Sequence, residues 1–268
     1  MRARFRCLLT SALLILIYFP TSAQVSYPNT LLWRISGKEL KKPSYLFGTM
    51  HLKDARIFHF SDSLYHYLEQ SEGYAMEIDP EMAIAALMKS MSEPDTSGLL
   101  YESISKEEFR KVAAGLEKKF KIPATQVTRK QAWLYKLSKG YGEKTKPDDM
   151  NTAVDTYLFN IARRQGKWVG GIEDIEDQFT VMEDLLNAED FGNRRKSGLS
   201  AMEKLIQTYI AQDLNGINNW IAKMDPVYKE RMLTKRNVKM SQRMDSLAQI
   251  RSQFFAVGAA HLPGEDGV

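Results

Sequence analysis

The sequence predicts an α/β protein, with a central mixed β-sheet flanked by helices and a long helical insertion. Three observations lead to this prediction. Short apolar runs that end at glycine or proline alternate with longer helical patterns. The first two runs, Leu31–Ile35 and Ser44–Phe47, are close enough in the chain to form a hairpin. Helical patterns dominate residues 176–250, which places the insertion between the last two strands.

Each predicted element has a local cause in the sequence. Five apolar runs bounded by turn-forming residues are predicted as strands: Leu31–Ile35, Ser44–Phe47, Gly73–Ile78, Lys167–Ile172 and Ser252–Val257. Helices are predicted where a capping residue or an early proline precedes a helical pattern. The predicted helices are Asp62–Gln70, Glu81–Met91, about 105–119, about 128–139, about 151–166, and a series over 176–250 with breaks near Gly192, Gly216 and Pro226.

The N-terminus has the features of a secretory signal peptide. Three arginines among the first six residues precede the apolar run 8–19, and small residues at 21–23 are suited to cleavage before Gln24. The run is shorter than the roughly 20 residues of a membrane span, and an uncleaved anchor is the alternative. We expect residues 1–23 to be the signal and residues 24–268 to form a single domain. The mature protein would then be periplasmic or secreted.

Composition excludes several kinds of function. Cys7 is the only cysteine and lies within the predicted signal, so the mature chain has no disulfide, cysteine nucleophile or thiolate metal site. Any metal site must use His, Asp and Glu. The net charge of +4 is small, and basic residues are interspersed among acidic ones. We therefore expect neither nucleic-acid binding nor, after signal cleavage, a stable membrane span.

Polar side chains follow four of the predicted strands. They are His51, Glu77, Glu173 and His261. In open α/β sheets ligands bind at the carboxyl ends of the strands, so these side chains would converge if their strands are parallel. Each histidine stands three residues after a glycine that ends a strand, Gly48 or Gly258. Two imidazoles and two carboxylates without sulfur suit Mn, Co, Fe or Zn, and such an ion would activate water for attack on a carbonyl.

Each of these residues also has a simpler interpretation. The Gly-x-x-His pattern alone is weak, and many histidines are surface residues. Glu77 is equally compatible with a strand-end charge that faces solvent. Glu173 begins an acidic stretch, and a negative charge there would also stabilise a helix N-terminus. His59 and His66 follow no strand, and we expect them on the surface.

The sequence resembles the TraB/GumN family, which is related to the Tiki metalloproteases. The resemblance spans almost all of the mature chain, and its segments are specific in combination although each alone is not. The segments are Leu32–Ile35, Tyr45–His51, Met76–Ile78, Gly170–Glu173 with Gln178, Arg236–Asn237 and Phe255–Gly264. The resemblance implies a mixed sheet flanked by helices, similar to the haem-uptake (ChaN-like) and erythromycin-esterase folds.

The resemblance also implies metal-dependent peptide hydrolysis. In Tiki-like members two Gly-x-x-His elements and a glutamate carry that activity, and the matching residues here are His51, His261 and Glu77. Asp155 and Arg236, like Glu173, match further family positions. Members usually continue beyond the second histidine with a helix and a strand, so the chain looks truncated at its C-terminus.

We therefore expect an exported metal-dependent hydrolase that cleaves a peptide or protein substrate. His51 and His261 would bind Mn, Co or Zn, or one would be a general base; Glu77 would be a ligand or base. Glu173 is a further candidate ligand, and Arg236 a candidate for stabilising the oxyanion. Two alternatives remain. One is a non-catalytic protein that binds a peptide, haem-like or polysaccharide-related ligand in the same cleft. The other is a metal-free esterase-like hydrolase with a histidine base.

Overall fold

A computed structural model describes residues 26–37, 40–93, 98–99, 106–138, 147–179, 181 and 191–268. The predicted signal peptide lies outside these residues. The strands are β1 (Leu32–Ile35), β2 (Ser44–Thr49), β3 (Gly73–Met76), β4 (Trp168–Gly171) and β5 (Gln253–Gly258). The longer helices are α2 (Asp62–Gln70), α3 (Pro80–Ser90), α4 (Lys106–Phe120), α5 (Arg129–Ser138), α6 (Val154–Arg164), α8 (Phe191–Ile210), α9 (Leu214–Ile221) and α11 (Lys235–Ile250). Short helices are η1 (Ala55–Phe58), η3 (Ala124–Gln126), α10 (Pro226–Lys229), the π-helical turn η4 (Glu230–Thr234) and η5 (Ala259–His261).

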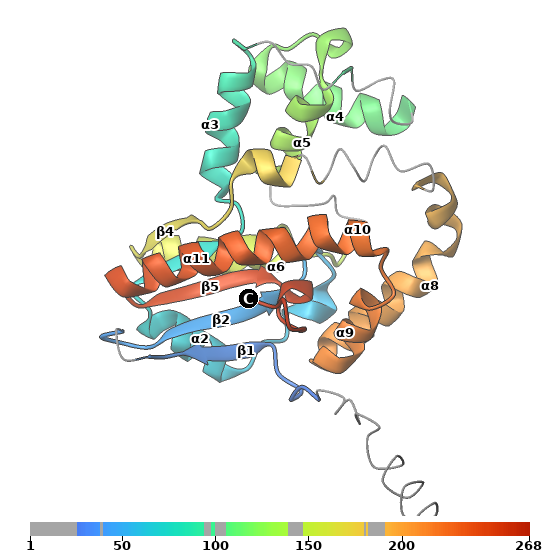
Figure 1. Cartoon of the computed structure of the whole chain (residues 1–268). Helices are drawn as coiled ribbons and strands as arrows, with labels where there is room; N and C mark the ends of the chain where they lie inside the picture. The colour runs from blue at the N-terminus through green and yellow to red at the C-terminus, as the bar shows by residue number, and fades with distance from the viewer. Residues whose placement is uncertain are drawn as a thin grey trace, which may run out of the picture.

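The five strands form one mixed sheet in the order β1-β2-β5-β3-β4 (Figure 1). β1 pairs with β2 in antiparallel register, which confirms the predicted hairpin. The other neighbouring pairs, β2 with β5, β5 with β3 and β3 with β4, are parallel. The last strand therefore lies between two earlier ones. The carboxyl ends of four strands meet at one edge of the sheet, as the sequence prediction requires.

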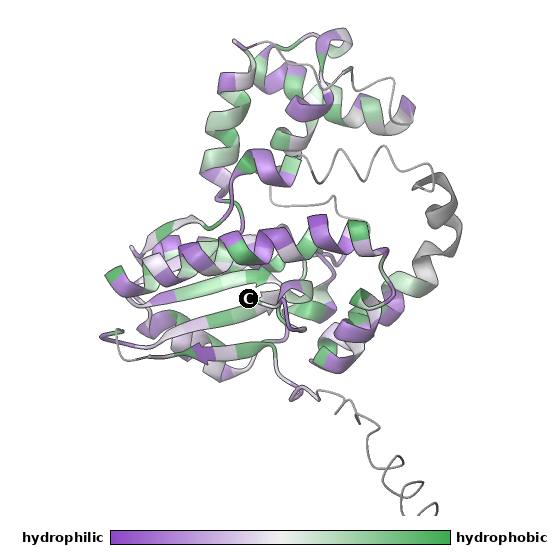
Figure 2. Ribbon diagram, viewed as in Figure 1, coloured by the Kyte–Doolittle hydropathy of each residue, from purple (hydrophilic) through white to green (hydrophobic). Residues whose placement is uncertain are grey.

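Helices cover both faces of the sheet, and the residues of β5 alternate between them. Phe254 and Ala256 pack in a core with α2, α6, α8 and α9, whereas Phe255 and Val257 pack with α11 on the other face. Figure 2 shows the central strands in the green of apolar residues, while α11 carries hydrophilic residues along much of its length. This two-sided burial explains why the last strand is a nearly continuous apolar run.

The helices α3, α4 and α5 form a third cluster beside the sheet edge (Figure 1). Their core includes Leu87, Leu116 and Leu134, each fully buried. Ile78, which follows β3, and Phe179, from a helical segment that begins at 175, also belong to this cluster. The cluster thus packs against the chain segments that leave β3 and β4.

The helical insertion between the last two strands is confirmed. The break predicted near Gly216 lies at 211–213, between α8 and α9, and α8 begins at Phe191, beside the break predicted near Gly192. The side chain of Asp213 accepts a hydrogen bond from the Gly216 backbone, so it caps α9 and places the glycine in the first turn. The break at Pro226 is correct because α10 begins there. Within the described segments, no helix is both long and apolar enough to cross a membrane.

Replacing Phe255 by alanine is expected to lower the free energy of unfolding by about 3–5 kcal/mol, since this fully buried ring fills the core between β5 and α11. Val227→Ala, at a side chain that is 62% exposed, should change it by less than about 0.5 kcal/mol. Urea denaturation followed by circular dichroism measures both. Similar losses in the two variants would contradict the assignment of β5 to the core.

Candidate functional site

The structure brings together all four of the polar side chains that follow strands in the sequence. His51 follows β2, Glu77 follows β3, Glu173 follows β4, and His261 ends the short helix η5 after β5. Glu77, Glu173 and His261 are buried, whereas the side chain of His51 retains 31% of its exposure. The parallel pairing of the strands causes this convergence, and His51 is the member of the group that solvent reaches most easily.

One oxygen of Glu77 is the meeting point of both Gly-x-x-His elements. Its Oε1 atom accepts a 2.6 Å hydrogen bond from the backbone N–H of Gly258. The same oxygen lies 3.4 Å from His51 Nε2 and 3.8 Å from His261 Nε2. A Cβ atom on Gly258 would stand 3.2 Å from Glu77 Oε1 and 3.4 Å from His51 Nε2. Glycine at this position therefore allows the backbone to approach the carboxylate and the imidazole.

The other oxygen of Glu77 is held by Arg236 and Gln178. Arg236 Nη2 lies 2.9 Å from Glu77 Oε2, and Gln178 donates to the same oxygen at 3.0 Å. Arg236 also binds Glu173 through two contacts of 2.6 Å, and its Nη1 donates to the Met232 carbonyl in the π-helical turn. This buried guanidinium thus bridges two carboxylates.

These contacts change the roles expected for Arg236 and Glu173. Each of the three nitrogens of Arg236 contacts a protein acceptor, and the residue is buried. These contacts favour the orientation of carboxylates over the predicted oxyanion role for Arg236. Both oxygens of Glu173 contact that guanidinium, which disfavours the predicted role of Glu173 as a metal ligand.

Burial and charge pairing shift the pKa values of the two glutamates in opposite directions. Burial alone would raise the pKa of Glu77, but His51, His261 and Arg236 together hold that pKa well below its usual value. Burial raises the pKa of Glu173, assisted by the nearby charge of Glu77 and opposed by Arg236. Glu77 is consequently the more acidic of the two glutamates, at the centre of the cluster.

Asp155, in the first turn of α6, contacts the second ring nitrogen of His51. The distance from His51 Nδ1 to Asp155 Oδ2 is 3.3 Å, and Asp155 is buried. The backbone carbonyl of Asp155 accepts a 2.7 Å hydrogen bond from Tyr74, which anchors α6 to β3. Burial alone would lower the pKa of His51, yet the charges of Asp155 and Glu77 raise it well above the usual value. His51 is therefore a strongly basic imidazole between two carboxylates.

His261, in contrast to His51, is a weakly basic imidazole. Burial lowers its pKa to about 4; the positive charges of Arg236 and His51 act in the same direction, and Glu77 opposes them. Its Nδ1 atom lies 2.5 Å from Oδ1 of Asn237 on α11. His261 is therefore a neutral imidazole at pH 7, with one nitrogen occupied by an amide and the other directed at Glu77.

The donors fit a divalent cation in their chemistry, although they are not arranged as a closed cage. Among the described residues, no three His, Cys, Asp or Glu side chains form a preassembled metal cluster. In a tetrahedral site, two donors that each lie about 2.0–2.2 Å from one ion are about 3.3–3.6 Å apart. The 3.4 Å distance from His51 Nε2 to Glu77 Oε1 is within that range, and the 3.8 Å distance from His261 Nε2 is slightly beyond it. Glu77 Oε1 is the atom that the two pairs share.

His59 and His66 stand apart from this cluster, as their sequence setting predicts. Both are exposed. His59 contacts the Arg56 carbonyl through Nδ1, and the ring of His66 lies against Tyr67. They serve as natural controls for the other two histidines.

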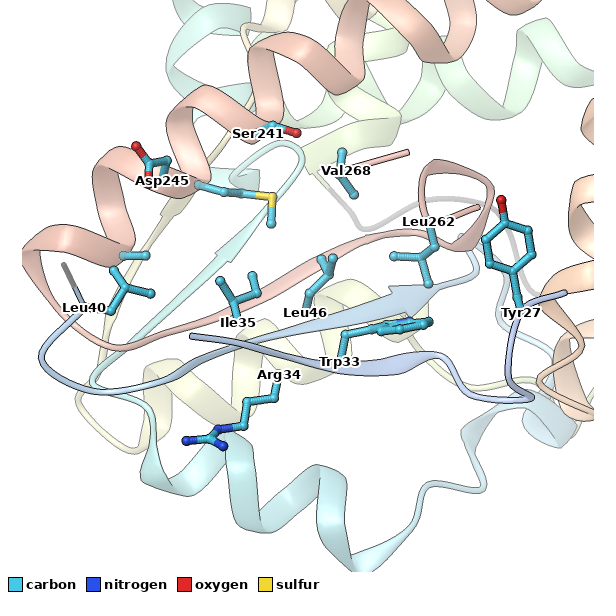
Figure 3. A pocket seen from close by; sticks show the side chains of 12 residues that line it. Tyr27, Trp33, Arg34, Ile35, Leu40, Leu46, Ser241, Asp245, Leu262 and Val268 are labelled. Carbon is cyan, nitrogen blue, oxygen red and sulfur yellow. The ribbon is translucent and has the colours of Figure 1, made fainter. Parts of the chain in front are cut away.

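A groove of about 450 Å³ lies between the β1–β2 hairpin and α11, on the α11 face of the sheet (Figure 3). Its walls are mainly apolar and include Trp33, Leu46 and Met244. The side chains of His51, Glu77 and His261 do not line it, but Leu262 does. The groove therefore adjoins the candidate site through Leu262 and through Val268, whose N–H donates to the His261 carbonyl.

The chain belongs to the TraB/PrgY/gumN family, whose model matches residues 31–268. It is similar to Metalloprotease TIKI2 of Danio rerio, with 23% identity over 90% of this chain and 58% of the relative. Metalloprotease TIKI1 of Danio rerio is 24% identical over 92% of this chain and 62% of its own length, and TIKI1 of Xenopus tropicalis is 25% identical over 90% and 59%. The chain spans about three-fifths of the length of these curated relatives. No solved structure matches it.

Arg236→Met is expected to lower the free energy of unfolding by about 3–5 kcal/mol, because it leaves two buried carboxylates without their cation. The matched control is Arg243→Met on the same helix, whose pairing with Asp174 is exposed. That loss should be at most about 1 kcal/mol. Chemical denaturation at pH 7 compares the two variants, and equal losses would exclude the bridging role of Arg236.

Proposed function

We propose that this member of the TraB/PrgY/gumN family is an exported metal-dependent hydrolase that acts on peptide bonds. The observation that carries the proposal is the direction of the two imidazoles: the Nε2 atoms of His51 and His261 both face Oε1 of the buried Glu77. The metalloprotease names of its distant relatives support the reaction class.

The arrangement of donors around Glu77 Oε1 suits a cation. Neutral His261 has Asn237 at Nδ1, so its Nε2 atom presents a lone pair to a carboxylate oxygen. Two acceptors that face each other repel, and a positive ion between them removes that repulsion. His51, His261 and Glu77 would hold the ion, with Mn²⁺, Co²⁺ or Zn²⁺ as the candidates that imidazole and carboxylate donors suit.

The other residues of the site have separate roles in the proposed reaction. When bound, the cation would polarise the substrate carbonyl and lower the pKa of a water molecule. Arg236, Gln178 and the Gly258 amide hold Glu77 in place, and its low pKa makes it a better ligand than base. Asp155 orients His51 through its second nitrogen, as carboxylates commonly do for metal-binding histidines.

The contact between His51 and Asp155 also favours a second candidate function. A half-exposed histidine oriented by a buried carboxylate is the arrangement of a general base in metal-free hydrolases. In that case His51 would take a proton from water or a nucleophile, and Glu77 would stabilise the resulting imidazolium. Metal dependence distinguishes the two candidates.

Removal of metal is expected to abolish hydrolysis of a quenched fluorescent peptide library, and added Mn²⁺ or Co²⁺ should restore it. His51→Ala and His261→Ala should each lower Co²⁺ affinity at least about 10–100-fold by calorimetry and abolish activity, because each removes a ligand. His59→Ala and His66→Ala should change neither quantity. Binding should weaken as pH falls, since the raised pKa of His51 makes protons compete with the ion. Undiminished hydrolysis in excess chelator would favour the His51 base instead.

Export is proposed from the basic residues, apolar run and small residues of the first 23 positions. Expression of the whole chain in a Gram-negative host should yield a periplasmic protein whose intact mass corresponds to a start at Gln24. A variant with the three early arginines changed to glutamate should remain uncleaved, because the positive n-region is lost. Recovery of uncleaved wild-type protein from the cytoplasm would refute export.

A further inference from the structure

The side chain of Asn237 on α11 contacts the buried ring of His261. Asn237 and His261 are 4% exposed each. Their side chains meet at 2.5 Å between Oδ1 and Nδ1. The next residue toward the N-terminus, Arg236, binds the two glutamates. Consecutive residues of one helix thus hold two different parts of the site.

The orientation of the Asn237 amide is fixed from its other side. Its Nδ2 group donates a 2.5 Å hydrogen bond to the backbone carbonyl of Asp266. That carbonyl belongs to the segment after His261, which folds back so that the Val268 N–H donates to the His261 carbonyl at 2.9 Å. Because a carbonyl only accepts, the nitrogen of the amide must face Asp266 and the oxygen must face His261.

This orientation decides which nitrogen of His261 carries its proton. An amide oxygen cannot donate, so the Nδ1 atom that contacts it must carry a proton. In the uncharged ring, which has one N–H, Nε2 is then left with its lone pair. Without Asn237 the ring would have an evident alternative, in which Nε2–H donates to the carboxylate of Glu77 that it already faces.

We propose that Asn237 is a positioning residue that fixes His261 in the Nδ1–H tautomer and keeps the Nε2 lone pair available at Glu77. The inference rests on the proposed function of this site, because a lone pair is what either a metal ligand or a general base at His261 needs. In this arrangement the Asn237 amide opposes a hydrogen bond from His261 to Glu77, and the Asp266 carbonyl orients that amide.

The test is a direct measurement of the tautomer in the metal-free protein. Long-range ¹H–¹⁵N correlation spectra distinguish protonated from unprotonated ring nitrogens, and single His→Gln variants assign the four histidines. We expect a protonated Nδ1 and an unprotonated Nε2 for His261 at neutral pH. A wild-type spectrum with Nε2 protonated, or with both nitrogens protonated, overturns the proposal whatever the variants do.

Two substitutions separate positioning from general damage to the fold. Asn237→Leu removes the acceptor at similar volume, and Nε2–H should become populated. Asn237→Asp loses the donor to the Asp266 carbonyl but retains an acceptor for His261, and it should keep Nδ1 protonated. Gln242→Leu, at an exposed position of the same helix, should leave the tautomer unchanged. Retention of Nδ1–H in a folded Asn237→Leu variant contradicts the role of Asn237.

Metal titration supplies an independent readout. Co²⁺ affinity by calorimetry should fall about 10–100-fold in Asn237→Leu and be largely retained in Asn237→Asp. Failure of wild-type protein to bind Co²⁺, together with the expected tautomer, would count against the metal proposal while supporting the positioning role. Unchanged Co²⁺ affinity in Asn237→Leu would count against the positioning role alone.

Discussion

The burial of the Glu77 carboxylate at the edge of the sheet is the constraint on which the site depends. Removing a carboxylate from water costs several kcal/mol unless charges and hydrogen bonds replace the lost hydration. The replacements come from separate parts of the chain: the backbone of β5, the guanidinium on α11, the amide of Gln178 and the imidazoles after β2 and β5. No single supersecondary unit supplies all of these groups. The site therefore forms only when these separate parts of the chain have come together.

The first turns of α11 provide one of the groups that replace the lost hydration of Glu77. The π-helical turn η4 leads directly into α11, and its Met232 carbonyl accepts from Arg236. Arg236 and Asn237 continue the buried stripe that Met240, Met244 and Ala248 form farther along the helix. One helix therefore uses the apolar part of its stripe to cover the sheet and the polar part to organise the site.

Sequence patterns predicted the architecture better than they predicted the partners. The apolar runs identified all five strands, and the position of polar residues after them located His51, Glu77 and His261 at one edge. The partners of Arg236 could not be predicted, because a charged residue in a largely polar helix resembles a solvated one. Its place on the stripe of Met240 and Met244 was the available signal, and the same signal marks Asn237. Asp155 likewise occupies the buried stripe of α6, one turn before Leu158 and Phe159.

The place of β5 in the sheet has a consequence for how the chain acquires its structure. Tyr45 and Tyr74 both pair in register with Phe254, so the two halves of the parallel sheet have no direct contact until residues near 254 arrive. A nascent chain consequently exposes two unpaired strand edges for most of its synthesis, and such long-range pairing is slow. Such a delay would suit the proposed export, because an export channel accepts an unfolded chain more readily than a folded domain. During the same interval, unpaired strand edges are places at which chains can aggregate.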